Sequence, residues 1–319
     1  MSIIKAIIVA VVAIIAILAV IIIINIPNYL EFRDQMEDSR KQLLAGSNTT
    51  QTRAGPIEYA DAGEGYPVLV LHGAGGGYDQ GLILSQVFLG DNFRVIAPSR
   101  FGFLRTPLPA NATPAAQADA YIDLLDELNI SKVAVIGISA GGPSSLEFAL
   151  RHPDRVSALV LVSAVVHKEK PMDFRDKIIH HVIFRSDFLF WIIAKNFESS
   201  LISFFGVSPQ VQANLTPDEK HWLSDIMIPA IHPINQRQAG MLNDRINFAF
   251  LDYQLDKITV PTLIIHAGDD LLVNPSHSEY AARRIPNARV ITLESGGHLL
   301  MGHHGRVRSE IVGFLEQHT

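Results

Sequence analysis

The sequence predicts an α/β fold built on a doubly wound, mostly parallel sheet, and three observations support this fold class. Of the 319 residues, 48% are hydrophobic and only 18% are charged, which allows a large packed core. Short apolar runs rich in β-branched residues recur along the chain, as in strands buried on both faces of a parallel sheet. Helical stretches separate several of these runs, and such alternation places helices on both faces of the sheet. The predicted strands are Pro67–Leu71, Phe93–Ala97, Lys132–Ile136, Ala158–Val162, Thr262–His266 and Arg289–Leu293.

Three helices are predicted around these strands. Apolar residues recur at helical spacing over Thr113–Leu128, where Thr113 is a suitable N-cap before Pro114. Ala140–Arg151 directly follows a predicted strand, and Val307–Glu316 closes the chain. Ligands of such sheets bind at the carboxyl ends of the strands, so the residues that follow the strands are the candidates for a site.

One segment interrupts the alternation. Residues 167–256 contain no clear parallel-strand run but many helical and aromatic stretches. We interpret them as a helical cap inserted over the carboxyl edge of the sheet, between the core segments 54–166 and 257–319. Most of its rings are expected to pack the cap's own core, and the remainder suggest an apolar ligand. The rings are those of Phe184, Phe188, Phe190, Trp191, Phe197, Phe204, Phe205, Trp222, Phe248 and Phe250.

The amino-terminal residues form a separate apolar run. Every residue from Ala6 to Ile24 is Ala, Val, Ile or Leu, and this run would form about 28 Å of helix, close to the thickness of a bilayer core. No polar stripe interrupts the run, and no small-x-small cleavage site follows it. These features predict an N-terminal transmembrane helix, an uncleaved single-pass anchor over residues 1–27. A polar linker over residues 28–53 is expected to follow, with a short helix within Glu31–Arg53.

Two indications of membrane orientation conflict. The basic residues after the run outnumber Lys5 before it, which leans toward a cytoplasmic domain. A short head with a single lysine before a long apolar run is instead how exported, anchored proteins usually begin. We favour an extracytoplasmic catalytic domain, and the side of the membrane stays open at this point.

Charge and composition exclude several classes of protein. The net charge is −6 without a long run of Lys or Arg, so no nucleic acid is expected as a partner. The chain has no cysteine, which excludes disulfides, a thiolate nucleophile and cysteine-based zinc sites. The thirteen histidines form no HExxH pattern and no carboxylate-rich cluster. We therefore expect no metal and no cofactor.

A first chemical motif is Gly137-Ile138-Ser139-Ala140-Gly141, which lies between a predicted strand and a predicted helix. A serine in such a turn is presented at the start of the helix, where developing negative charge is favoured, and the glycines permit close packing around it. The bare string GxSxG is weak evidence, but its strand-turn-helix context is considerably stronger. Ser139 is the predicted nucleophile.

A second motif, His72-Gly73-Ala74-Gly75-Gly76-Gly77, directly follows the first predicted strand. An acyl-transfer enzyme must stabilise the oxyanion of its tetrahedral intermediate, and backbone N–H groups in a glycine-rich loop can approach it closely. Ala74 and Ala140 are the expected donors. The alternative, a phosphate-binding loop, lacks its usual GK[ST] ending because Tyr78 and Asp79 follow the glycines.

A third motif is split between two late strands. Asp269 and Asp270 follow the strand Thr262–His266, and His298 follows the last strand. The order serine, aspartate, histidine along the chain, each after a strand, is that of a Ser-His-Asp triad in this kind of sheet. His298 would take the proton of Ser139, and an aspartate would orient the imidazole and stabilise the imidazolium.

With these motifs, the chain from about residue 55 to the end resembles the α/β-hydrolase superfamily, in particular its serine-nucleophile branch with meta-cleavage-product hydrolases and haloperoxidase-like esterases. The segments that carry the resemblance are LVLHGAGGG, APSRFGFLRTPLP, VAVIGISAGGPSSLEFALRHPDRVSALVLVSA, VPTLIIHAGDDLLVNP and LESGGHLLMGHH. The usual family pattern around the acid, laid on His266-Ala267-Gly268-Asp269-Asp270, implies that Asp270 is the triad acid.

The chain departs from the family in two places. Ala267 replaces a usual glycine, and Ser99-Arg100-Phe101-Gly102-Phe103 stands where many relatives carry Asp-x-Pro-Gly. That loop borders the site, so it gives no firm analogy for the substrate. Relatives that form alkyl-enzyme esters, the haloalkane dehalogenases and epoxide hydrolases, have aspartate where Ser139 stands, and their chemistry is not expected.

The resemblance and the triad together predict a serine esterase that cleaves small to medium hydrophobic carboxylic esters through an acyl-enzyme intermediate. Its partners would be a hydrophobic ester and, through the first helix, a membrane. Gly73, Ile138 and Arg100 are expected to contact the substrate. Two alternatives stay open: a C–C bond hydrolase of the meta-cleavage-product type, with Arg100 or Arg105 on a substrate carboxylate, and a non-catalytic binding protein of the same fold.

Overall fold

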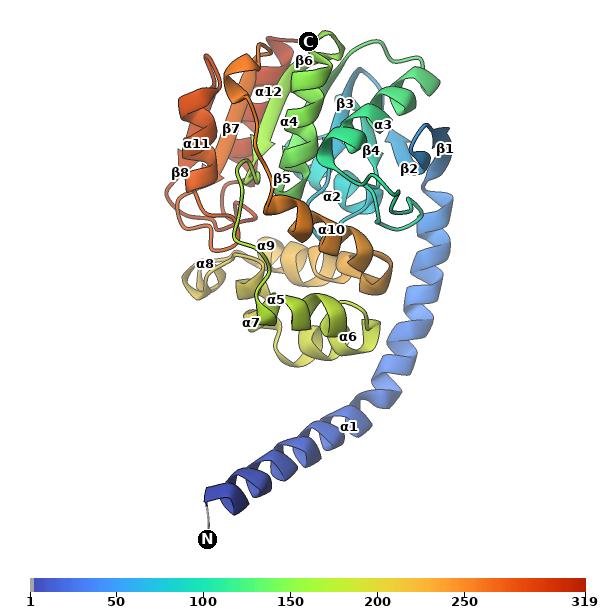
Figure 1. Ribbon diagram of the computed structural model, residues 1–319, viewed down its shortest axis with the longest axis vertical. Coiled ribbons are helices and arrows are strands. Elements are labelled where there is room, and N and C mark those ends of the chain that lie inside the picture. The colour runs from blue at the N-terminus through green and yellow to red at the C-terminus, as the bar shows by residue number, and fades with distance from the viewer. Residues whose placement is uncertain (1–2) are drawn as a thin grey trace.

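The computed structural model describes residues 3–319, and a single sheet organises them (Figure 1). Over these residues the sheet has eight strands in the order β1-β2-β4-β3-β5-β6-β7-β8. The β1 and β2 strands are antiparallel to their neighbours, whereas all pairs from β4 to β8 are parallel. The strands are β1 Asn48–Thr52, β2 Gly55–Ala62, β3 Tyr66–Leu71, β4 Phe93–Pro98, β5 Val133–Ile138, β6 Val156–Val162, β7 Thr262–Ala267 and β8 Arg289–Leu293.

The six predicted strands correspond to β3 through β8, so the prediction of a mostly parallel α/β sheet is confirmed. The prediction missed β1 and β2. Asn48–Thr52 contains no apolar residue, because this edge strand has only one neighbour and needs no apolar face. Gly55–Ala62 carries the buried carboxylate of Glu58, which interrupts its apolar pattern.

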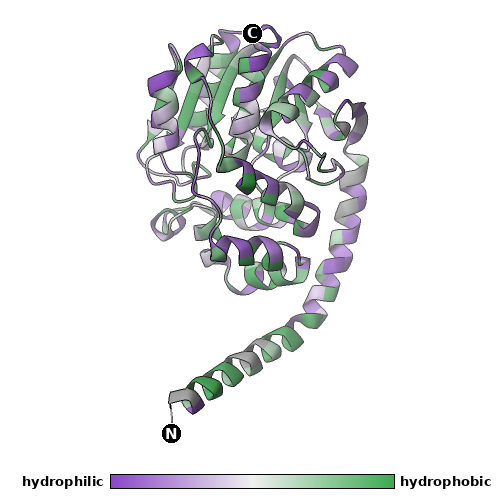
Figure 2. Cartoon of the chain, viewed as in Figure 1, coloured by the Kyte–Doolittle hydropathy of each residue, from purple (hydrophilic) through white to green (hydrophobic). Residues whose placement is uncertain are grey.

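Helices cover both faces of the sheet. On one face α3, α4 and α11 contribute to a large apolar core, and on the other α2 and α12 pack together against the strands. Figure 2 shows hydrophobic strands in the middle and hydrophilic stretches on the outer helices. The α-helices are α1 Ile3–Ala45, α2 Tyr78–Phe88, α3 Pro114–Glu127, α4 Gly142–Arg151, α5 Phe174–Ile178, α6 Asp187–Asn196, α7 Glu198–Phe204, α8 Pro209–Ala213, α9 Pro217–His221, α10 Gln238–Phe248, α11 Ser276–Arg284 and α12 His304–Glu316.

The chain between β6 and β7 is helical throughout its regular elements and forms a layer of its own (Figure 1). Besides α5–α10 it contains two short π-helical segments, η3 Ile179–Ile183 and η4 Trp222–Met227. A third apolar cluster lies within this layer and includes Phe184, Phe190 and Ile231. Buried ion pairs join the layer to the core, since Arg237 contacts both carboxylate oxygens of Asp79 at 2.9 and 2.6 Å.

The prediction of an N-terminal transmembrane helix is wrong. Among the residues that the structure describes, no helix combines the length and the apolar character needed to cross a membrane. The membrane partner, the single-pass topology and the extracytoplasmic placement depended on that helix and are corrected with it. The prediction treated Ala6–Ile24 as an element closed by polar residues, but α1 runs on to Ala45, and Asn25 Nδ2 donates to the Ile21 carbonyl within it at 2.8 Å.

The second part of α1 packs against the cap. Tyr29 lies edge-on to Phe188 with ring centroids 4.7 Å apart, and Phe32 stacks on Trp191 at 5.7 Å. Residues 28–45, predicted as a linker with a short helix, belong to the continuous helix α1, and β1 begins at Asn48. Aromatic burial of this kind stabilises the position of α1 beside α6.

Candidate active site

Ser139 stands at the sharp turn between β5 and α4. Its φ is 52°, a left-handed conformation that few residues other than glycine adopt and that presents the side chain out of the turn. The two motif glycines have no room for a side chain: a Cβ on Gly137 would lie 2.2 Å from Ser145 Oγ, and one on Gly141 would lie 2.3 Å from the Leu71 carbonyl oxygen. The GxSxG pattern is therefore required by packing at this turn.

His298 lies in the loop after β8 and reaches the serine. Its Nε2 is 2.9 Å from Ser139 Oγ, and both side chains are buried. Two contacts fix the loop: Gly206 of the cap accepts a hydrogen bond from the His298 N–H at 3.0 Å, and Asp269 accepts from the Gly297 N–H at 2.8 Å. Asp269 thus holds the loop that carries His298 and does not contact the imidazole.

Asp270 completes the chain of hydrogen bonds. Its Oδ2 is 2.8 Å from His298 Nδ1, and its Oδ1 accepts from the backbone N–H groups of Leu272 and Val273 at 2.8 and 3.0 Å. Burial alone would raise the pKa of Asp270, but the charge of His298 and the hydrogen bonds from His266, His298 and Val273 lower it below its usual value. The carboxylate is therefore ionised at neutral pH, and it accepts from His298 Nδ1–H and leaves Nε2 as the acceptor for the Ser139 hydroxyl.

Sequence reasoning missed a second histidine on the same carboxylate. His266 Nε2 lies 3.0 Å from Asp270 Oδ2 and 3.0 Å from the Val273 carbonyl oxygen. Both neighbours are acceptors, so Nε2 carries the proton and donates. The imidazole is buried, and within the described part of the chain its Nδ1 has no hydrogen-bond partner. The position of His266 at the end of β7, four residues before the acid, was the available signal.

The predicted oxyanion donors lie beside the serine. Ala74 and Ala140 both line the cavity that contains Ser139, and among the described residues the loop N–H of Ala74 donates no hydrogen bond. The neighbouring Gly73 N–H is occupied, since it donates to Gln80 Oε1 at 3.0 Å. A pair of free N–H groups next to the nucleophile is what stabilisation of an oxyanion requires.

A buried neutral histidine supports this loop. His72 Nε2 accepts from the Arg100 N–H at 2.9 Å, so its Nδ1 is protonated and donates to the Gly73 carbonyl at 2.8 Å. Burial, reinforced by the charge of Arg100, holds the pKa of His72 well below its usual value. The imidazole therefore acts here as a fixed hydrogen-bonding spacer between two loops.

The predicted substrate contacts lie in different places. Gly73 and Ile138 line the cavity, but Arg100 does not. The Arg100 guanidinium donates to both oxygens of Asp244 at 2.6 and 2.7 Å and to the His72 carbonyl at 2.9 Å. Arg105 pairs with the buried Glu58 at 2.7 Å. Both cations are thus engaged by protein carboxylates.

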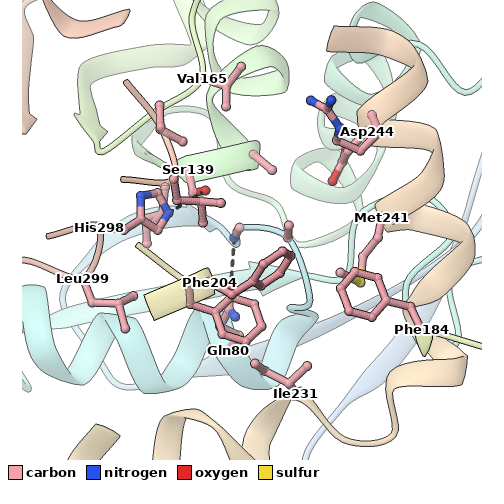
Figure 3. A pocket seen from close by; sticks show the side chains of 18 of the residues that line it. Gln80, Ser139, Val165, Phe184, Phe204, Ile231, Met241, Asp244, His298 and Leu299 are labelled. Atoms are coloured by element: carbon pink, nitrogen blue, oxygen red, sulfur yellow. Dashed lines mark hydrogen bonds between the residues drawn. The ribbon is translucent and has the colours of Figure 1, made fainter. Parts of the chain in front are cut away.

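The cavity above Ser139 has a volume of about 340 Å³ and runs from the sheet to the cap. Ser139 and His298 lie together on one side of it, and Phe184, Met241 and Asp244 lie across from them (Figure 3). Most of its lining is apolar, including Phe204, Phe205 and Phe248 of the predicted cap rings. Over residues 3–319 no three His, Asp or Glu side chains are grouped so as to hold a metal ion.

Comparison with known proteins identifies the family. A family model described as the alpha/beta hydrolase fold matches residues 66–304, and the chain belongs to this family. The resemblance inferred from the motifs is thereby confirmed, and the chain is a hydrolase by its family. In Figure 1 the matched region comprises strands β3–β8 and the cap.

Individual relatives cover most of the chain. The "Uncharacterized hydrolase YcgS" of Bacillus subtilis (strain 168) is 34% identical over 274 residues, 82% of this chain and 95% of the relative. A "Putative carbamate hydrolase RutD" of Stutzerimonas stutzeri (strain A1501) is 28% identical over 247 residues, 73% of this chain and 84% of the relative. The solved alpha/beta hydrolase fold protein from Nakamurella multipartita is 33% identical with a TM-score of 0.72, covering 84% of this chain and 98% of its own.

Proposed function

We propose that this chain is a serine esterase that hydrolyses small to medium hydrophobic carboxylic esters through an acyl-enzyme intermediate. One observation carries the proposal. The continuous hydrogen-bonded chain from Ser139 Oγ through His298 to Asp270 opens into a largely apolar cavity. A nucleophile with a base in contact, and a base oriented by a carboxylate, is the arrangement that acyl transfer needs.

The proposed first half-reaction follows from these contacts. Ser139 Oγ attacks the ester carbonyl carbon while His298 Nε2 accepts its proton, and the ionised Asp270 stabilises the imidazolium. The carbonyl oxygen becomes an oxyanion that the N–H groups of Ala74 and Ala140 stabilise. As the tetrahedral intermediate collapses, His298 gives its proton to the leaving alkoxide, and the acyl group stays on Ser139.

The second half-reaction reverses the roles with water. His298, again neutral, takes a proton from a water molecule, whose oxygen attacks the acyl carbon. The same N–H groups stabilise the second oxyanion, and His298 returns the proton to Ser139 Oγ as the acid leaves. The apolar lining supports an alkyl or acyl group that is itself apolar.

The cavity disfavours the C–C bond hydrolase alternative. This alternative needs Arg100 or Arg105 to bind a carboxylate of the substrate. In the structure these two side chains form ion pairs with Asp244 and Glu58. An additional cation would have to replace them. An ester without a carboxylate needs no cation in the cavity.

The proposal is tested with the full-length chain on p-nitrophenyl esters from acetate to palmitate, beside Ser139→Ala. We expect hydrolysis with an optimum at short or medium chains, and a loss in turnover on the order of 10⁶-fold in the variant. A matched p-nitrophenyl carbamate and a dienoate substrate are assayed in parallel. Activity on either of these without ester hydrolysis, or equal ester hydrolysis by Ser139→Ala, would overturn the proposal.

A further inference from the structure

The cap end of the cavity carries a group of titratable side chains that the proposed reaction does not use. All of them line the same cavity as Ser139. They come from two parts of the cap: the stretch from residue 169 through α5 to η3, and helix α10. Asp244 is seen across the cavity from Ser139 and His298 (Figure 3). The members of this cap-end cluster are Glu169, Asp176, His180, Asp244 and Arg245.

Every cation at this end is neutralised by a carboxylate. Arg100 donates to both oxygens of Asp244, and the two side chains are only 6% and 9% exposed. Arg245 contacts Glu169 and lies 3.2 Å from Asp176. Two guanidinium groups thus serve three carboxylates, and one negative charge is left over. A carboxylate on a ligand would add a second uncompensated charge beside Glu169 and Asp176, and like charges repel.

His180 supplies an independent indication of a ligand. It lines the cavity, is 7% exposed, and within residues 3–319 its Nδ1 has no hydrogen-bond partner. Burial, followed by the charge of Arg245, lowers the pKa of His180 to about 4, so the imidazole is neutral at pH 7. A neutral imidazole has one donor and one acceptor nitrogen, and leaving the buried Nδ1 without a partner is unfavourable.

We propose that the cap-end cluster is a binding subsite for a hydroxyl group at the far end of the ester substrate, and that it rejects a carboxylate there. This inference rests on the proposed esterase function. A hydroxyl group can donate to the carboxylate oxygens of Glu169 or Asp176 and exchange a hydrogen bond with His180. The remainder of the substrate lies against the apolar lining, so the substrate class is an apolar ester with a terminal hydroxyl group.

Binding is measured first in Ser139→Ala, where cleavage does not interfere. The ligands are methyl hexanoate, methyl 6-hydroxyhexanoate and monomethyl adipate, with a second series of acetates of 1-hexanol, 1,6-hexanediol and 6-hydroxyhexanoic acid. The two series place the terminal group on the acyl side or on the alcohol side of the ester. In at least one series we expect the hydroxyl ligand to have a Kd at least about tenfold below that of the carboxylate ligand.

The double variant Glu169→Gln/Asp176→Asn in the same Ser139→Ala background tests the cause. It removes two negative charges and leaves Arg245 without a carboxylate, so the preference for hydroxyl over carboxylate should fall below about threefold or reverse. The matched control is Asp225→Asn/Glu279→Gln, which removes two exposed carboxylates outside the cavity. It should keep the tenfold preference.

The outcomes separate the two proposals. Equal or tighter binding of the carboxylate ligands in both series, or a preference that the cavity variant keeps, overturns the subsite. If the hydroxyl preference is present but the unaltered chain cleaves none of the six esters, the subsite stands and the esterase function falls. If the unaltered chain cleaves the esters but shows no hydroxyl preference, the esterase function stands and the subsite falls.

Discussion

The two walls of the cavity satisfy their polar groups in different ways. On the sheet wall, hydrogen bonds run from the Ser139 hydroxyl to His298 and from His298 to Asp270, so each proton has a defined acceptor. On the cap wall, Arg245 and its carboxylates pair with one another, and Arg245 and Glu169 are partly exposed at 22% and 24%. The comparison suggests that the sheet wall determines which bond is broken and the cap wall determines which molecules enter.

After the loss of Ser139 itself, the largest effect is expected from the acid on the sheet wall. Asp270→Asn replaces the carboxylate that orients His298, and kcat should fall on the order of 10⁴-fold. Asp269→Asn is the matched control, since an amide oxygen can still accept from the Gly297 N–H that Asp269 holds. Steady-state kinetics on one short ester measure both variants. A large loss in Asp269→Asn with little in Asp270→Asn would reverse the assignment.

A smaller effect is expected from His266, a positioning residue on the same wall. His266→Leu removes one of two hydrogen bonds to Asp270 Oδ2, and kcat/KM should fall about tenfold, the equivalent of one such bond. The lost bond also leaves Asp270 a stronger acceptor for His298 Nδ1–H, which favours the protonated imidazole, so the acid limb of the pH profile should move upward. His266→Gln keeps a donor and should restore both values. A lower Tm with an unmoved pH profile would mean a purely structural role.

These two expectations also show what the sequence could and could not provide. The triad residues could be proposed from the sequence because Ser139 directly follows β5, and Asp270 and His298 lie in the loops after β7 and β8. Parallel strands end at one edge of the sheet, so these three positions are expected near one another. His266 lies inside such a run and reads as part of the strand, so its contact with Asp270 depends on how the next loop folds back. The roles of Ser139, Asp270 and His298 stay predictions until these variants are measured.

The cap and the first helix were harder to predict. The apolar run before Asn25 has the composition of a membrane segment, but composition does not reveal that the helix continues and packs on α6. Arg100 was expected at the substrate because its loop borders the site, yet its partner Asp244 lies 144 residues away in the chain. Such long-range ion pairs leave no local pattern in a single sequence.

The smallest expected effect is on stability and concerns His277, which contacts residues 166–169 where the chain passes from the sheet to the cap. His277 Nδ1 accepts from the Val166 and His167 N–H groups at 3.0 and 3.3 Å, its ring stacks on His167, and Glu169 lies 3.8 Å from its Nε2. Burial, with the charges of His167 and His266, lowers the pKa of His277 to about 3, against a small opposite effect of Asp270. The imidazole is therefore neutral in the folded chain under ordinary conditions.

The sign of the pH dependence follows from this shift. Below pH 6.5 the unfolded chain binds a proton on His277 that the folded chain does not, so stability is lost as the pH falls from 6.5 toward 3. His277→Asn keeps an acceptor for the two N–H groups but cannot be protonated. The decrease in Tm between pH 7.5 and pH 5.0 should be smaller in the variant than in the unaltered chain. An identical decrease would contradict the assignment.

The central claim is that Ser139 is an activated nucleophile, and covalent labelling tests it most directly. The full-length chain is treated with a fluorophosphonate probe, digested and analysed by mass spectrometry, beside Ser139→Ala and His298→Ala. We expect one adduct on the peptide that contains Ser139, no adduct in Ser139→Ala, and much slower labelling in His298→Ala. An unlabelled chain, or equal labelling of Ser139→Ala at another residue, would contradict it.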